Sequence, residues 1–148
     1  FISEEQAFNI MNDKTVVVLL DTHMAERAQC PELLRFTSRI VVIDHHRKNK
    51  DYIKNTILTY HEPYASSTSE MVTEILQYTD NGNKIRRFEA EALYAGIMLD
   101  TKNFSVKTGV RTFDAAAFLR KRGVDTTAVR DIFKVGFDEY KERLKIME

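Results

Sequence analysis

Two short apolar runs, each followed by an acidic residue, constrain the fold more than any other feature of this sequence. Thr15–Leu20 is rich in β-branched residues and stops at Asp21. Ile40–Ile43 repeats this pattern and stops at Asp44. Continuous apolar runs of this length are typical of strands that are covered on both faces, as in a parallel sheet. A third strand is expected over Thr56–Tyr60, after a loop rich in Lys and Asn.

The rest of the chain is predicted to be mostly helical. Ser3 is placed to cap a first helix that runs to Met11, and Pro31 suits the first turn of a helix that carries Leu33, Leu34 and Phe36. Phe88–Leu99 is apolar or small nearly all round, so we expect a buried helix that ends near Asp100. A helix is also expected from the capping box of Ser67 and Glu70 through Tyr78. Another is expected over Phe113–Arg122, with Gly123 as the residue that ends it. Asp125 is expected to cap a further helix, and a last helix is expected over Phe137–Met147.

Strands alternating with helices, followed by a helical C-terminal half, predict an α/β fold with a parallel sheet flanked by helices. The 148 residues fit one domain. Because 22 basic side chains are balanced by 22 acidic ones, the chain is not expected to bind duplex nucleic acid nonspecifically. The single cysteine, Cys30, is interpreted as a reduced thiol without a special role. No apolar run approaches the ~18–20 residues that cross a bilayer, so a cytoplasmic location is expected.

Polar side chains follow both predicted strands, at the edge of the sheet where α/β proteins bind ligands. Asp21 comes directly after the first strand, and Asp44, His45 and His46 come directly after the second. Taken singly, each has an ordinary alternative: Asp21 fits a helix cap, the paired histidines fit an exposed loop, and Asp100 fits a helix end. Together, carboxylates and imidazoles without a nearby thiolate favour Mn²⁺ or Mg²⁺ over structural zinc.

The paired histidines need not share one task. Neighbouring side chains of an extended segment point in opposite directions, so one imidazole can bind a metal while the other faces a substrate. Asp44 is placed to accept a hydrogen bond from an imidazole and to orient it. Arg47 and two lysines follow at once and supply cations where a phosphate would lie, although a solvated loop explains these charges equally well.

Several motifs resemble those of the DHH phosphoesterase superfamily, and they follow one another along the chain in the same order as in that superfamily. The signature itself corresponds to Ile43–Arg47, which reads Ile-Asp-His-His-Arg. The other similar segments are the strand end Val18–Thr22, the loop-to-helix segment Glu62–Glu70 and the later aspartate motif Ala95–Phe104. The run Thr108–Asp114 is similar to the branch of the superfamily that cleaves cyclic di-AMP.

The resemblance implies a role for each matching residue. Asp21 corresponds to the aspartate that bridges two metal ions, His45 to a ligand of one ion, and Asp100 to a further carboxylate of that ion. His46 corresponds to the histidine that contacts the phosphate and helps the leaving oxygen. The implied cofactor is a pair of Mn²⁺ ions, with Mg²⁺ as an alternative, which activate water for attack on phosphorus.

The implied reaction is hydrolysis of cyclic di-AMP to the linear dinucleotide. A nano-RNA or phosphoadenosine-type phosphatase of the same superfamily and a non-catalytic regulatory domain are the alternatives. The family's first metal motif is expected upstream of Phe1 and its C-terminal substrate-binding domain is absent, so we expect a partial catalytic domain with little turnover alone. Membrane attachment is implied only through other parts of a parent protein, and a homodimer is left open. His23 and His61 match no ligand position, and we expect both to be structural or exposed.

Overall fold

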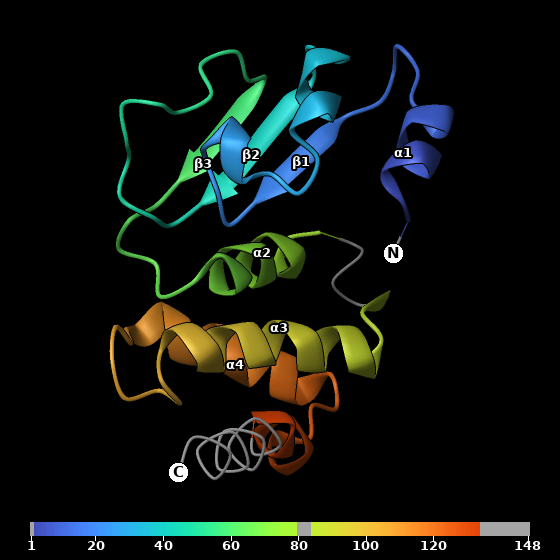
Figure 1. Ribbon diagram of the computed structural model, residues 1–148. Coiled ribbons are helices and arrows are strands. Elements are labelled where there is room, and N and C mark those ends of the chain that lie inside the picture. The colour runs from blue at the N-terminus through green and yellow to red at the C-terminus, as the bar shows by residue number, and fades with distance from the viewer. Residues whose placement is uncertain (1, 80–83, 134–148) are drawn as a thin grey trace, which may run out of the picture. The chain divides into compact units, whose positions relative to one another are not determined.

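The computed structural model describes residues 2–79 and 84–133, and the chain divides into two compact units. The first unit, Phe1–Thr68, contains α1 (Glu4–Ile10), β1 (Val17–Leu20), the 3-10 helices η1 (Ala25–Arg27) and η2 (Pro31–Arg35), β2 (Ile40–Asp44) and β3 (Leu58–His61), as Figure 1 shows. The second unit, Ser69–Glu148, contains α2 (Thr68–Gln77, which begins one residue earlier), α3 (Arg87–Asp100), α4 (Val110–Lys121) and a helix that starts at residue 126. The predicted helix Phe137–Met147 lies outside the described residues.

A three-stranded parallel sheet, in the order β1-β2-β3, forms the centre of the first unit (Figure 1). Its register pairs Leu20 with Ile43 and Asp44 with His61. Beyond β1 the backbone N–H of Asp21 continues the ladder by donating to the carbonyl of Ile43 (3.0 Å). All three strands therefore bring the residues at their carboxyl ends to the same edge, which confirms the predicted parallel α/β sheet.

The prediction that the first strand is covered on both faces is wrong. Val18 and Leu20 are 50% and 49% exposed, and side chains along β1 alternate between half-buried and exposed. By contrast β2 is buried almost throughout, and Val42 is 1% exposed. The difference follows from the strand order, because β2 is the central strand and β1 lies at an edge, where alternate side chains face solvent.

The short helices α1 and η2 of the first unit begin where they were predicted to begin, but they are shorter than predicted. Ser3 caps α1 by accepting from the N–H of Gln6 (3.2 Å), as expected. Pro31 begins η2, which is a 3-10 helix of only five residues. Phe36, expected on that helix, follows it and is largely exposed, with its ring edge-to-face on Phe8 at 5.1 Å between centroids.

The core of the second unit lies between α3 and α4. Its buried members are Ala90, Tyr94, Ile97 and Met98 on α3, Ala115, Ala116 and Leu119 on α4, and Val124 and Val129 beyond them. The helix predicted from Phe113 begins earlier, at Val110. Gly123 follows its end with φ +91°, a left-handed conformation that favours glycine, as predicted. Asp125 caps the next helix, because its carboxylate accepts from the N–H groups of Thr127 (2.9 Å) and Ala128 (3.1 Å).

The prediction that α3 is buried all round is also wrong. Phe88 and Leu99 are 59% and 65% exposed, although both belong to the apolar run. Apolar residues on every side of a helix permit complete burial but do not require it, since the partner elements decide which side is covered. Among the helices of the described residues, none is both long and apolar enough to span a membrane.

Candidate metal centre at the carboxyl edge of the sheet

Asp21 occupies an unusual backbone position directly after β1. Its φ of +64° lies in the left-handed region, which Asp and Asn enter more readily than other non-glycine residues. The hydrogen bond from the backbone N–H of Asp21 to the carbonyl of Ile43 fixes the backbone at Asp21, and the hydroxyl of Thr68 donates to Asp21 Oδ1 (2.8 Å). The carboxylate is thereby held at the edge of the sheet while more than half of its side chain stays exposed.

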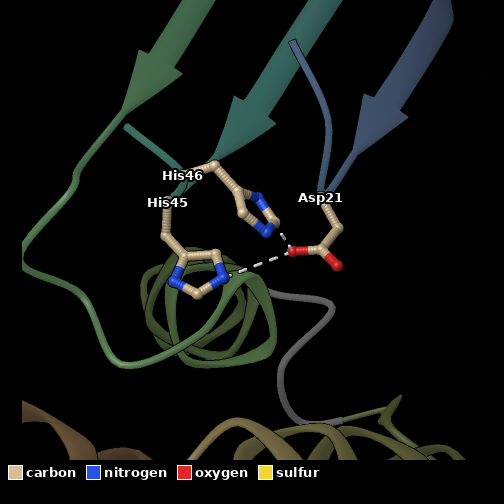
Figure 2. Close-up of side chains that lie close together, drawn as sticks. All are labelled: Asp21, His45 and His46. Carbon is tan, nitrogen blue, oxygen red and sulfur yellow. Dashed lines mark ion pairs between the residues drawn. The ribbon is translucent and has the colours of Figure 1, made fainter. Parts of the chain in front are cut away.

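His45 directs one ring nitrogen toward that carboxylate. Its Nδ1 lies 3.3 Å from the carbonyl of Ala65, and a carbonyl can only accept, so Nδ1 carries the proton. In the neutral ring Nε2 then presents a lone pair, and it lies 3.5 Å from Oδ1 of Asp21 (Figure 2). The His45 side chain is almost fully buried, which restricts it to this orientation.

The spacing of these two atoms fits a shared divalent cation. Bonds of about 2.0–2.2 Å from one ion to two ligand atoms, at angles near 90–110°, place those atoms roughly 3.0–3.5 Å apart. A metal-binding imidazole commonly donates its other N–H to a backbone carbonyl, as His45 does to Ala65. The ligand atoms of Asp21, His45 and His46 all lie within 4.8 Å of one another. The side chains present here therefore suit a hard or borderline divalent ion.

His46 is held differently from its neighbour. Its Nδ1 is 3.9 Å from Oδ1 of Asp21 but only 2.7 Å from Oδ1 of Asp44, to which it donates (Figure 2 shows the ring beside Asp21). The same Asp44 oxygen also accepts the backbone N–H of His46 (3.2 Å). Since Nδ1 carries the proton of the neutral ring, Nε2 is the nitrogen of His46 that presents a lone pair.

Asp44 is the buried acceptor for these contacts. Its side chain is fully buried, and its second oxygen, Oδ2, accepts a short hydrogen bond from Nδ1 of His23. Burial raises the pKa of Asp44, but the hydrogen bonds from His23 and His46 outweigh this effect and hold the pKa below its usual range. The carboxylate is therefore charged at neutral pH and orients the rings of His23 and His46.

His23 and His61 were expected to be structural or exposed, and the structure gives both a defined place. His23 is buried, and its Nε2 accepts the backbone N–H of Asn49 (3.1 Å). His61 lies beside Asp44 in the strand register and contacts the carbonyl of His46 through Nε2 (2.5 Å). Its ring meets that of His23 edge-on, at 5.6 Å between centroids. The available sequence signal was position: His61 is the last residue of β3, and His23 follows shortly after the end of β1 at Leu20.

The remaining predicted site residues are Arg47 and Asp100. Arg47 is exposed in the loop that follows His46. Asp100 is the last residue of α3, in the second unit, and its membership of the metal site stays a prediction. The chain turns tightly after it: Thr101 is buried, its hydroxyl donates to the carbonyl of Ile97 (2.6 Å), and the next three residues all have positive φ.

The fold and site together define an α/β protein with a carboxylate and imidazole cluster at the carboxyl edge of a parallel sheet. The chain belongs to the DHH family, whose N-terminal domain matches residues 2–97. It is 47% identical over its whole length to the cyclic-di-AMP phosphodiesterase GdpP of Bacillus subtilis. It is 34% identical, over 68% of its length and 18% of the relative's, to a probable manganese-dependent inorganic pyrophosphatase of Thermotoga maritima.

A solved structure shares the fold. An exopolyphosphatase-related protein from Bacteroides fragilis superposes with a TM-score of 0.68 at 26% identity, over 84% of this chain and 37% of that one. The present chain spans 22% of the length of the Bacillus subtilis relative. These comparisons establish the family and the fold of this chain.

Proposed function

We propose that this chain carries metal-binding and phosphate-contacting residues of a phosphodiesterase that hydrolyses cyclic di-AMP to the linear dinucleotide. The observation that carries the proposal is the pair formed by Nε2 of His45 and Oδ1 of Asp21, 3.5 Å apart at the carboxyl edge of the sheet. The substrate is supported by 47% identity, over the whole chain, to a protein named for cleaving this nucleotide.

Asp21, His45 and Asp100 would hold the metal, with Asp21 shared between two ions. Carboxylate and imidazole donors support Mn²⁺, with Mg²⁺ as an alternative, and one relative is named as manganese-dependent. Divalent ions supply Lewis acidity and make water a better nucleophile at neutral pH. The protein's own contribution is to hold Asp21 in its left-handed conformation and to present the lone pair of His45 toward it.

His46 and Arg47 would act on the phosphate. Asp44 holds the Nδ1–H of His46, so that the lone pair of Nε2 is directed outward. After taking up a proton from solvent at Nε2, the ring would donate to a phosphate oxygen and pass that proton to the leaving oxygen, which returns the ring to the Nδ1–H form. Arg47 follows directly and is exposed, which leaves its guanidinium available for charge-assisted hydrogen bonds to the same phosphate.

The proposal is tested by Asp21→Asn, with Asp13→Asn as the matched control. Asn tolerates the φ of +64° at position 21, so this variant removes the charge without straining the backbone. Asp13 is an exposed carboxylate in a turn, so its variant makes the same chemical change away from the site. Because removal of even an indirect partner of a metal ligand typically weakens binding ~10–100-fold, we expect Asp21→Asn to weaken Mn²⁺ binding by at least about 100-fold.

The measurements are Mn²⁺ affinity by titration calorimetry and hydrolysis of cyclic di-AMP, linear dinucleotides and short RNA, all on the protein that includes this chain. Asp13→Asn should match the wild type in both. Equal Mn²⁺ binding by the two variants would overturn the metal site and favour a regulatory domain. Faster hydrolysis of the linear substrates than of cyclic di-AMP would instead indicate a nano-RNA or phosphoadenosine-type phosphatase.

A further inference from the structure

His23 is buried beside the site, and both of its ring nitrogens are engaged. Nε2 accepts the backbone N–H of Asn49 at 3.1 Å, and Nδ1 makes a short contact with Oδ2 of Asp44. A backbone N–H can only donate, so Nε2 must present a lone pair. The single proton of the neutral ring is therefore on Nδ1 and is donated to Asp44.

This proton assignment excludes a second metal site in the same place. His23, Asp44 and His61 lie close enough together to suggest three ligands. A metal on Nδ1 of His23 would need a lone pair there, while the N–H of Asn49 needs the lone pair on Nε2. An imidazole presents both lone pairs only after losing its last proton, so the cluster is a hydrogen-bonded array and not a cation site.

Asp44 consequently links two histidines through its two oxygens. Oδ2 accepts from His23, and Oδ1 accepts from the ring Nδ1 of His46 (2.7 Å) and from its backbone N–H (3.2 Å). Asp44 is fully buried, so no water replaces a lost donor without a rearrangement. Removing the donor from Oδ2 would drive the carboxylate to rotate toward another partner, and this rotation weakens its hydrogen bond to the His46 ring.

We propose that His23 is a positioning residue, which holds Asp44 and through it keeps the His46 ring in the Nδ1–H tautomer with Nε2 directed to the substrate. The catalytic meaning of this tautomer rests on the proposed function, but the hydrogen-bond array does not. In water the Nε2–H form of histidine is the usual neutral tautomer, so the fixed Nδ1–H form is a property that Asp44 imposes on His46.

His23 also ties the loop after His46 to the strand end. Its ring accepts from Asn49, and its carbonyl accepts the N–H of Ile53 (2.9 Å). A role limited to anchoring this loop is therefore the competing explanation. The two roles use different ring nitrogens, which makes them separable by substitution.

The test compares His23→Asn with His23→Gln. The amide nitrogen of Asn occupies roughly the place of Nδ1, so His23→Asn keeps a donor for Asp44 but loses the acceptor for Asn49. The longer Gln side chain reaches the place of Nε2, so His23→Gln keeps the loop contact and loses the donor. The tautomer of His46 is read from long-range proton–nitrogen correlation spectra of the whole chain labelled with ¹⁵N-histidine, at about pH 8, above the usual imidazole pKa of roughly 6.5.

We expect wild type and His23→Asn to show His46 as the Nδ1–H tautomer, and His23→Gln to shift it toward the Nε2–H tautomer. In Mn²⁺-dependent hydrolysis by the protein that includes this chain, we expect His23→Gln to lower kcat ~10–100-fold with a smaller change in KM, and His23→Asn to stay near the wild type. An unchanged tautomer in His23→Gln would overturn the proposal. Should that variant not fold, a folded His23→Asn that has lost the Nδ1–H form would overturn it equally.

The spectra also separate this inference from the proposed function. If the wild-type protein cleaves no phosphodiester but the tautomer shifts as expected, the positioning of His46 by His23 stands and the proposed reaction fails. If hydrolysis is normal and both variants behave alike in spectra and in kcat, the reaction stands and the positioning role fails.

Discussion

Among the glycines that the structure describes, Gly96 on α3 is the one where an added methyl group would meet the closest neighbouring atoms. A Cβ at this position would lie 2.1 Å from Oγ of Ser69 and 3.0 Å from Cβ of Ser69. Rotation of the Ser69 hydroxyl relieves the first contact at little cost. The second contact is relieved only if the backbone of α2 or α3 shifts by a few tenths of an ångström, because Cβ is fixed to the backbone.

The expected size of the effect is a balance of two opposed terms. Overpacking of a tight contact typically costs ~1–3 kcal/mol. Alanine is favoured over glycine inside a helix by about 1 kcal/mol, which offsets part of that cost. We therefore expect Gly96→Ala to lower the free energy of unfolding by about 1 kcal/mol, which corresponds to roughly 2–4 °C in Tm for a protein of this size.

The assay is urea unfolding followed by circular dichroism, in both the wild-type and the Ser69→Gly backgrounds. Without the Ser69 side chain the close contact disappears, so only the helix-propensity term remains and Gly96→Ala should become stabilising. The sign of the Gly96→Ala effect should thus reverse between the two backgrounds. A destabilisation of the same size in both would refute the assignment of the cost to Ser69.

Two further predictions follow from the second unit. Leu119 is fully buried and Leu99 is 65% exposed. Leu119→Ala should therefore lower the free energy of unfolding by ~2–5 kcal/mol, whereas Leu99→Ala should change it by less than about 0.5 kcal/mol. Similar losses of stability in the two variants, measured by urea unfolding, would contradict a core between α3 and α4. The N–H groups of Ala128 and Thr127 hold the pKa of Asp125 below its usual range, so the stabilisation from this cap is complete above the unfolded-state pKa of about 3.9 and is lost as the pH falls through the lower folded-state value. Asp125→Asn keeps a capping oxygen that does not titrate, so its stability relative to wild type should rise on acidification through this window, and parallel pH profiles of the two proteins would contradict the assignment.

The elements were predicted best where local chemistry decides them. Ser3, Gly123 and Asp125 each act on backbone groups a few residues away, and each lies at the helix end that its type predicts. The burial of apolar side chains was predicted least well. Val18 and Leu99 are apolar and were expected to be buried, yet both are exposed. Burial depends on which element lies opposite a side chain, and that information is not local.

The site shows the same division. The strand-end positions of Asp21 and of the Asp44-His45-His46 run were predictable, because parallel strands bring their carboxyl ends to one edge. The sequence also indicated that Asp44 orients an imidazole, without showing which one. The metal-binding role of Asp21, His45 and Asp100 stays a prediction.

The amino-acid sequence by itself determined the residue types at the strand ends and the parallel sheet that gathers Asp21 and His45. Only the tertiary structure decided which ring nitrogen of each histidine faces a carboxylate, and that His23 shares Asp44 with His46. The physical reason is that a tautomer is set by the partner of each nitrogen. His23 lies 21 residues from Asp44 and 26 from Asn49 along the chain, and only folding brings both to its ring.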